Sequence, residues 1–124
     1  MPVPLLKQGS TVIASLRSAL SDPDWELFRQ RLITQTGVWR SNGAVIDLTA
    51  MDVIDSFAAR SVRDLVAMLR LRGVEAVVVG IQPDVAFAMV QLGLRMEGVP
   101  VAMDLEEGLL ALRERLRARR HHHG

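Results

Sequence analysis

Cysteine is absent from this chain of 124 residues, and histidine occurs only at positions 121–123, directly before the last residue. The lack of cysteine excludes disulfide bonds, thiol nucleophiles and thiolate metal ligands. We interpret the three histidines as the remnant of an affinity tag and leave them out of the functional argument. Because the usual general base and the common nucleophile pairs are then missing, we expect no enzyme and no metal site.

Phosphate-binding loops are also missing, since neither G-x-x-x-x-G-K-[ST] nor G-x-G-x-x-G after a strand occurs. The sequence therefore implies no nucleotide chemistry and no cofactor. A net charge of +1 gives no general field that would attract nucleic acid or an anionic membrane. No apolar run approaches the ~20 residues of a membrane-spanning helix, and from the first residues we expect no targeting segment. We expect a soluble, cytoplasmic protein.

Aromatic residues are scarce, at 4% of the chain against 49% hydrophobic residues, so the core must be aliphatic. Apolar runs bounded by turn residues predict strands at 5–7, 11–16, 44–48, 75–80 and 99–103. Helical spacing and capping residues predict helices at 22–37, 55–72, 83–92 and from 104 onward, the first of them capped by Asp22. This order indicates an α/β fold. We expect a mixed, mostly parallel sheet of about five strands, with an N-terminal hairpin and four packed helices.

The length fits one domain, which we place at residues 1–118, followed by a basic tail at 119–124 that includes the tag remnant. Five arginines crowd the C-terminal end, and a solvated helix end is the simplest interpretation of them. The third predicted helix carries only one charge, Asp84, so more than one of its faces is apolar. Its surplus apolar surface is either buried deep in the domain or exposed as a partner surface.

The most informative segment runs from the apolar strand at Ala44 through a short acidic link to Ser56 at the start of a helix. The first helical turn has unpaired N–H groups and a positive dipole end, which favour added negative charge such as a phosphate. Arg60, one turn later, and Arg63 are placed to approach that phosphate. Ordinary helix capping by serine or aspartate is the alternative.

Asp47, Asp52 and Asp55 raise a second alternative, because carboxylates at the end of a strand can hold magnesium or accept a phosphoryl group. A receiver-like site would need an acid after an earlier strand and a late lysine. The sequence has neither, because the predicted strand at 11–16 has no acid and the single lysine is Lys7. We therefore interpret Asp52 as a solvated turn residue and Asp55 as a helix cap.

Three motifs resemble the STAS domain of anti-sigma-factor antagonists, and in particular the RsbS-type stressosome proteins. They are the Asp47-Leu48-Thr49 link, Ile54-Asp55-Ser56-Phe57, and Gly80-Ile81-Gln82-Pro83, and the resemblance continues through residues 103–109. It implies a scaffold that a serine kinase of RsbT type phosphorylates at Ser56, which releases the kinase for downstream stress signalling. It also implies assembly with RsbR-type STAS proteins, and with further copies of the chain, into a large cytoplasmic complex.

On this basis we expect supporting roles for Asp55, Arg60, Asp52 and Thr49, and a partner surface at Phe57, Gln82 and Asp84. Phe57 and Ala58 depart from the broader antagonist pattern, Asp-Ser-Ser/Thr-Gly, which leaves Ser56 as the hydroxyl that matches the motif. Thr49 and Ser61 are minor candidates for phosphorylation. The alternative function is a ligand- or nucleotide-sensing STAS module without phosphorylation, with its site near the helix starts at Asp55 and Pro83.

Overall fold

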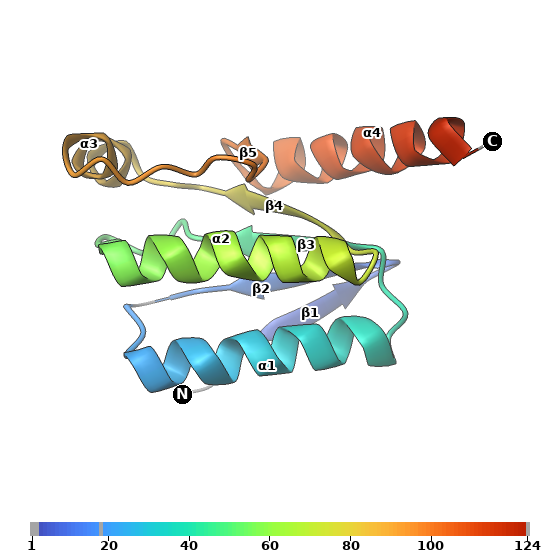
Figure 1. The fold of residues 1–124 in the computed structure, drawn as a ribbon, viewed down its shortest axis with the longest axis horizontal. Helices are drawn as coiled ribbons and strands as arrows, with labels where there is room; N and C mark the ends of the chain where they lie inside the picture. Colours follow the sequence, from blue (N-terminus) through green and yellow to red (C-terminus); the bar gives the residue numbers. More distant parts are fainter. Residues whose placement is uncertain (1–2, 18, 124) are drawn as a thin grey trace.

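The computed structural model describes residues 3–17 and 19–123, which form one sheet with helices on both of its faces (Figure 1). The five strands are β1 (Leu5–Gln8), β2 (Thr11–Ser15), β3 (Gly43–Asp47), β4 (Glu75–Val79) and β5 (Val101–Ala102). The helices are α1 (Asp22–Val38), α2 (Ser56–Leu71), α3 (Pro83–Gln91) and α4 (Leu105–His123). The predicted α/β class, the number of strands and the four helices are confirmed.

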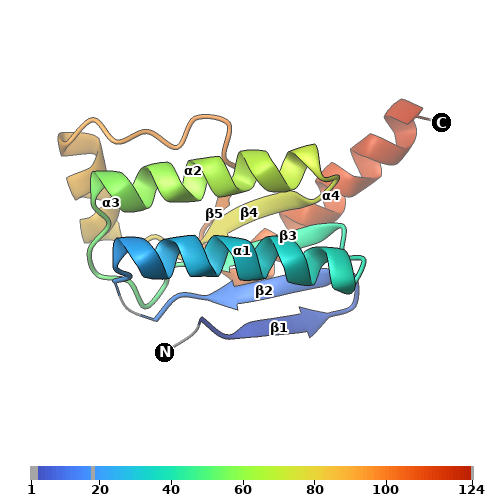
Figure 2. The same cartoon turned by 60° about the horizontal axis from the view of Figure 1, so that its bottom comes forward.

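The strands lie in the order β1-β2-β3-β4-β5. β1 is antiparallel to β2, and every other neighbouring pair is parallel. The connections between the parallel strands contain α1, α2 and α3, and α4 follows the last strand; α1 and α2 cover one face of the sheet and α4 covers the other (Figure 2). The predicted mostly parallel sheet with an N-terminal hairpin is therefore confirmed.

Alternation along the central strands divides the core into two layers. Ile46 and Val78 point into the larger layer, under α1 and α2, whereas Val45 and Val77 point into the smaller layer, under α4. The predicted apolar stripe of α2 is buried throughout in the larger layer, and it consists of Ala58, Val62, Leu65, Val66 and Leu69. Burial on both sheet faces explains why β3 and β4 are almost uninterrupted apolar runs.

Two local predictions are wrong. Ser21, not Asp22, caps α1, because the Ser21 hydroxyl accepts a hydrogen bond from the Asp24 N–H at 3.3 Å. The last strand is two residues long rather than the five of 99–103. The Val99 N–H bonds to the Met96 carbonyl in a turn, at 3.1 Å, and the residues after Ala102 turn into the start of α4.

Helix α4 begins after Asp104, whose carboxylate accepts the Glu107 N–H at 2.9 Å, as the sequence predicts. The helix continues to His123, so Arg119 and Arg120 extend it beyond residue 118. Arg119 donates to the Gly73 carbonyl at 3.1 Å. The domain boundary after residue 118 stays a prediction. Among the residues described, no helix is both long and apolar enough to cross a membrane.

Candidate functional site

Ser56 is the first residue of α2, and Asp55 before it is the N-cap. The Asp55 carboxylate accepts a hydrogen bond from the Ala58 N–H at 2.8 Å, and its carbonyl accepts one from the Ala59 N–H at 3.0 Å. Asp55 therefore satisfies the need for a cap at this helix start. The prediction of Asp55 as the helix cap is confirmed, and Ser56 is not the cap.

The Ser56 side chain is exposed, and its hydroxyl forms no hydrogen bond within the described residues. The N–H groups of Ser56 and Phe57 also have no protein partner in this part of the chain. These groups lie at the positive end of the α2 dipole, where added negative charge is favoured. An accessible hydroxyl with no structural task thus stands where a phosphate group is best tolerated.

The link before Ser56 is held by its own side chains. The Asp47 carboxylate accepts hydrogen bonds from the Thr49 N–H at 2.9 Å and from the Thr49 hydroxyl at 2.5 Å. Leu48, Met51 and Ile54 are buried and anchor the link to the core, whereas Asp52 between them is exposed. The link therefore fixes where α2 begins.

The second motif, Gly80 to Pro83, packs directly against this link. Gly80 has a φ of 77°, and a Cβ atom there would lie 2.0 Å from the Thr49 hydroxyl oxygen. The Gln82 side-chain amide donates to the Thr49 carbonyl at 2.6 Å. Two motifs that are far apart in the sequence therefore form one unit at the carboxyl ends of β3 and β4.

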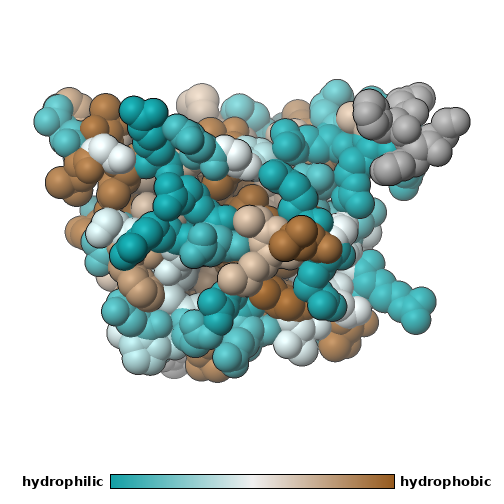
Figure 3. All heavy atoms as spheres, viewed as in Figure 1, coloured by the Kyte–Doolittle hydropathy of each residue, from teal (hydrophilic) through white to brown (hydrophobic). Residues whose placement is uncertain are grey.

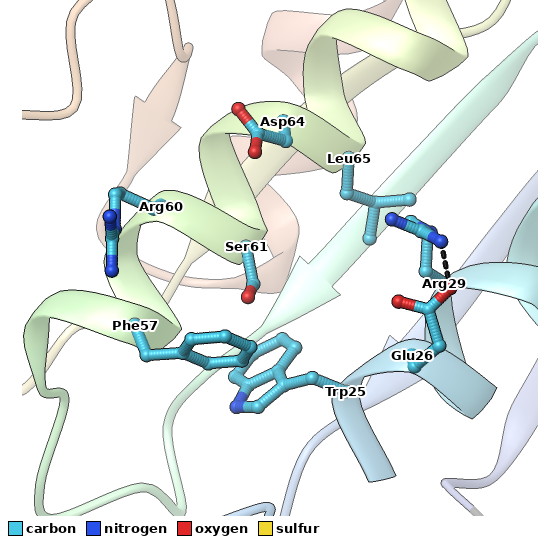
Figure 4. Close-up of a pocket in the computed structure, with 8 residues that line it drawn as sticks. All are labelled: Trp25, Glu26, Arg29, Phe57, Arg60, Ser61, Asp64 and Leu65. Atoms are coloured by element: carbon cyan, nitrogen blue, oxygen red, sulfur yellow. Dashed lines mark hydrogen bonds and ion pairs between the residues drawn. The ribbon is translucent and has the colours of Figure 1, made fainter. Parts of the chain in front are cut away.

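The residues predicted for the site fall into two neighbouring groups. Asp52, Thr49, Gln82 and Asp84 lie in the link or at the start of α3, the same end of the sheet as Ser56 (Figure 1). Phe57 and Arg60 instead line a pocket between α1 and α2 (Figure 4). Arg60 is exposed and takes part in none of the ion pairs of the described residues.

The minor candidates for phosphorylation differ from Ser56 either in burial or in hydrogen bonding. The Thr49 hydroxyl is bonded to Asp47 and packed against Gly80. Ser61 is half-buried in the pocket between the helices. Of these three hydroxyl groups, that of Ser56 is the one without burial or an internal hydrogen bond.

The acidic residues of the link do not gather into a metal site. Asp47 and Asp55 each accept a hydrogen bond from a backbone N–H, two and three residues further along the chain respectively. Across the described ranges, no three His, Asp or Glu side chains are grouped so that they could hold a metal ion. Asp55 is a cap, as the sequence predicts.

Helix α3 presents most of its apolar surface to solvent. Val85 and Met89 are buried, but Phe87 is 67% exposed and Val90 76% exposed. Deep burial, one of the two interpretations of this helix, is therefore wrong. Hydrophobic side chains gather where α3 lies, at the left of Figure 3.

The exposed surface continues into a groove of about 450 Å³ between α3 and the edge strand β5, where Val101 and Met103 are also exposed. Sequence reasoning missed these two residues, because an apolar segment at a sheet edge has the same pattern as a buried strand. The pocket between α1 and α2 was also missed, since its walls come from segments distant in the sequence.

Comparison with known proteins identifies this architecture. The family model described as the STAS domain matches residues 3–108. The chain belongs to the STAS domain family. This STAS domain spans about a quarter of the length of two curated relatives from Bacillus subtilis (strain 168), both RsbT co-antagonist proteins. RsbRC is 39% identical over 64 residues, which are 52% of this chain and 23% of RsbRC. RsbRB is 32% identical over 65 residues, which are 52% of this chain and 24% of RsbRB.

Solved structures match the STAS domain over nearly its whole length. One is RsbS from Moorella thermoacetica with a serine-to-glutamate substitution, which has a TM-score of 0.79 and 28% identity and covers 94% of this chain and 99% of that chain. Another comes from the molecular architecture of the stressosome, described as a signal integration and transduction hub. Its TM-score is 0.77 and its identity 30%, over 92% of this chain and 99% of that chain. The chain therefore has the STAS fold that these solved structures share.

Proposed function

We propose that this STAS domain is a scaffold of a stressosome-type complex that binds a serine kinase of RsbT type and releases it when Ser56 is phosphorylated. The observation that carries the proposal is the division of tasks at the start of α2. Asp55 caps the helix, so the neighbouring exposed Ser56 hydroxyl has no structural task. In this role the chain is the substrate of the kinase and not itself a catalyst, and it acts in the cytoplasm.

Phosphorylation changes the charge of this surface strongly. A phosphate adds about 1.5 to 2 negative charges at neutral pH. It would stand beside the Asp55 carboxylate and near the exposed Asp52, and Arg60, one helical turn away, is the cation that can approach it. A kinase surface that fits the neutral serine would then meet repulsion and a desolvation penalty. One covalent change becomes a binding switch.

Assembly with RsbR-type STAS proteins and with further copies of the chain is the second part of the proposal. The similarity to the stressosome structure and to the RsbT co-antagonist proteins supports it. The exposed apolar surface of α3 and β5 supports it as well, because contiguous apolar patches on a soluble domain mark interaction surfaces. For contact with the kinase we retain Phe57, Gln82 and Asp84 beside Ser56.

The phosphorylation site is tested by incubating the protein with an RsbT-type kinase and ATP and locating the phosphate by mass spectrometry. Ser56→Ala is expected to abolish labelling, because it removes the acceptor oxygen. Ser61→Ala and Thr49→Ala keep the acceptor and should still be labelled, and Thr34→Ala, which removes a hydroxyl at a separate pocket, is the matched control that should be labelled like the unsubstituted protein. Equal labelling of Ser56→Ala and the unsubstituted protein would show that Ser56 is not the acceptor.

The switch is tested separately by measuring kinase binding with Ser56→Asp and Ser56→Ala. The aspartate places a permanent negative charge at the helix start, so we expect a Kd at least about tenfold higher, the effect of roughly 1.4 kcal/mol. The alanine variant should bind like the unsubstituted protein. If the aspartate variant retains full affinity, charge at residue 56 does not control release.

A further inference from the structure

A pocket of about 340 Å³ opens between α1 and α2 (Figure 4). Its lining includes Phe57, the residue that directly follows Ser56. Trp25 and Leu65 form buried walls, with Trp25 only 4% exposed. Phe57 stands at the rim with 36% of its surface exposed, and the Ser61 hydroxyl lies on the side that faces the two aromatic rings. The pocket thus has one aromatic and one aliphatic buried wall, with a second aromatic ring at its rim.

The charged residues around the pocket balance one another. Glu26 and Arg29 form an ion pair across one turn of α1, and Arg60 and Asp64 stand on α2. Two cations and two anions give the lining no net charge, so a charged ligand gains no general attraction. The interior instead favours a neutral ring that stacks on Trp25 and Phe57.

One polar group of the pocket has no partner among the described residues. The Ser61 hydroxyl forms no hydrogen bond within this part of the chain. Leaving such a group unpaired when the pocket is covered would be unfavourable. An occupant must therefore supply hydrogen-bonding atoms of its own, as the hydroxyl of tyrosine or the indole of tryptophan does.

We propose that this pocket receives a tyrosine or tryptophan side chain of the partner kinase and anchors the kinase next to Ser56. The inference rests on the proposed function. Phe57 belongs to the pocket and directly follows Ser56, so a kinase that reaches the Ser56 hydroxyl also covers the pocket rim. The volume is at the lower end of the range of small-molecule sites, roughly 300 to 1,000 Å³, and suits a single anchoring side chain.

The anchor explains how one phosphate can release the kinase. Aromatic residues in desolvated pockets provide much of the binding free energy at protein interfaces. A phosphate on Ser56 would place its charge one residue from the Phe57 wall, where it must be desolvated for the anchor to stay in place. Phosphorylation would therefore weaken the contact of the anchor with the pocket.

The test fills the pocket and measures the Kd of the RsbT-type kinase. Ser61→Tyr, and Ser61→Leu as a smaller change, place a side chain where the anchor would lie, and the Kd should rise at least about tenfold. Thr34→Tyr is the matched control, because Thr34 lines a separate pocket of about 490 Å³ whose walls include α1 residues and Leu5. Its Kd should stay within about twofold. Urea unfolding of each variant verifies that it is folded.

A second readout needs no substitution in the pocket. With 5-fluorotryptophan in this chain, the ¹⁹F signal of Trp25 should shift when the kinase binds, whereas that of Trp39, in the control pocket, should not. A Trp39→Phe variant assigns the two signals. If the kinase binds, but Trp25 does not respond and Ser61→Tyr binds like Thr34→Tyr, the anchor is overturned while the scaffold function stands. If the unsubstituted protein binds no kinase, the proposed function itself fails.

Discussion

The two ends of the parallel sheet use charged and polar side chains in different ways. At the amino ends of the strands, Glu75 at the start of β4 lies between Arg70 of α2 and Arg115 of α4, with N···O distances of 3.7 and 3.5 Å. Because the two helices lie on opposite faces of the sheet, one buried carboxylate links both layers to the strand. Arg119 adds a bond from α4 to the Gly73 carbonyl.

At the carboxyl ends, polar side chains bind the backbone or a side chain close by. Asp47 holds Thr49, Asp55 caps α2, and Gln82 reaches the Thr49 carbonyl. These bonds shape the link after β3 and the Gly80 to Pro83 segment after β4, which are called the two links below. They leave Ser56 and the exposed face of α3 without internal partners. In open α/β sheets, ligands bind at this end, outside the carboxyl ends of the strands. One end holds the layers together, and the other presents side chains.

Of the features at the two ends of the sheet, the contact between the two links should be the most sensitive to a single substitution. Gly80→Ala places a Cβ atom against the Thr49 hydroxyl and forces alanine into a positive φ. We expect a loss of about 2 to 4 kcal/mol in the free energy of unfolding, from the steric overlap and the strained backbone together. Urea unfolding measures the loss.

Gly93→Ala is the matched control for this change. Gly93 has a similar φ of 71°, but a Cβ atom there meets nothing within 4 Å. Its substitution should cost only the strain of the backbone, about 1 to 2 kcal/mol. Equal losses for the two variants would show that the two links do not depend on their close contact.

The layer-linking role of Glu75 is tested at the opposite end. Arg70→Ala and Arg115→Ala each leave Glu75 one cation, and because both arginines are partly exposed, each change should cost less than about 1 kcal/mol. The double variant leaves the buried carboxylate without either cation, so we expect about 1 to 3 kcal/mol, more than the sum of the single losses.

Arg117→Ala is the control in this series, since it breaks an exposed pair within α4 and should change stability by less than about 0.5 kcal/mol. Strict additivity of the Arg70 and Arg115 variants would mean that Glu75 does not couple the two helices. The charged residues at the amino end of the sheet would then contribute to stability independently of one another.

Much of the fold could be predicted from local patterns. The buried stripe of α2, its end at Gly73 and the apolar strands β3 and β4 all follow from spacing and from residue types that fit only a few conformations. The short β5 and the exposure of Phe87 could not be predicted. An apolar residue shows the same pattern whether the rest of the chain covers it or not, and only the tertiary arrangement decides.

The same division holds at the site. The position of Ser56 at a helix start and the cap at Asp55 are local properties, and the sequence predicts both. The bond from Gln82 to Thr49 joins residues 33 positions apart. The pocket between Trp25 and Phe57 likewise depends on how α1 lies against α2. Such contacts have no signature in a single sequence.

The smallest expected effect separates the cap from the proposed acceptor. Asp55→Ala removes the acceptor for the Ala58 N–H and should cost about 0.5 to 2 kcal/mol, whereas Asp55→Asn keeps an acceptor and should cost much less. Ser56→Ala removes a hydroxyl without an internal bond, so its stability should change by no more than about 0.5 kcal/mol. Urea unfolding of the three variants measures both effects. A Ser56→Ala loss as large as that of Asp55→Ala would mean that the hydroxyl supports the fold and is not free to serve as a switch.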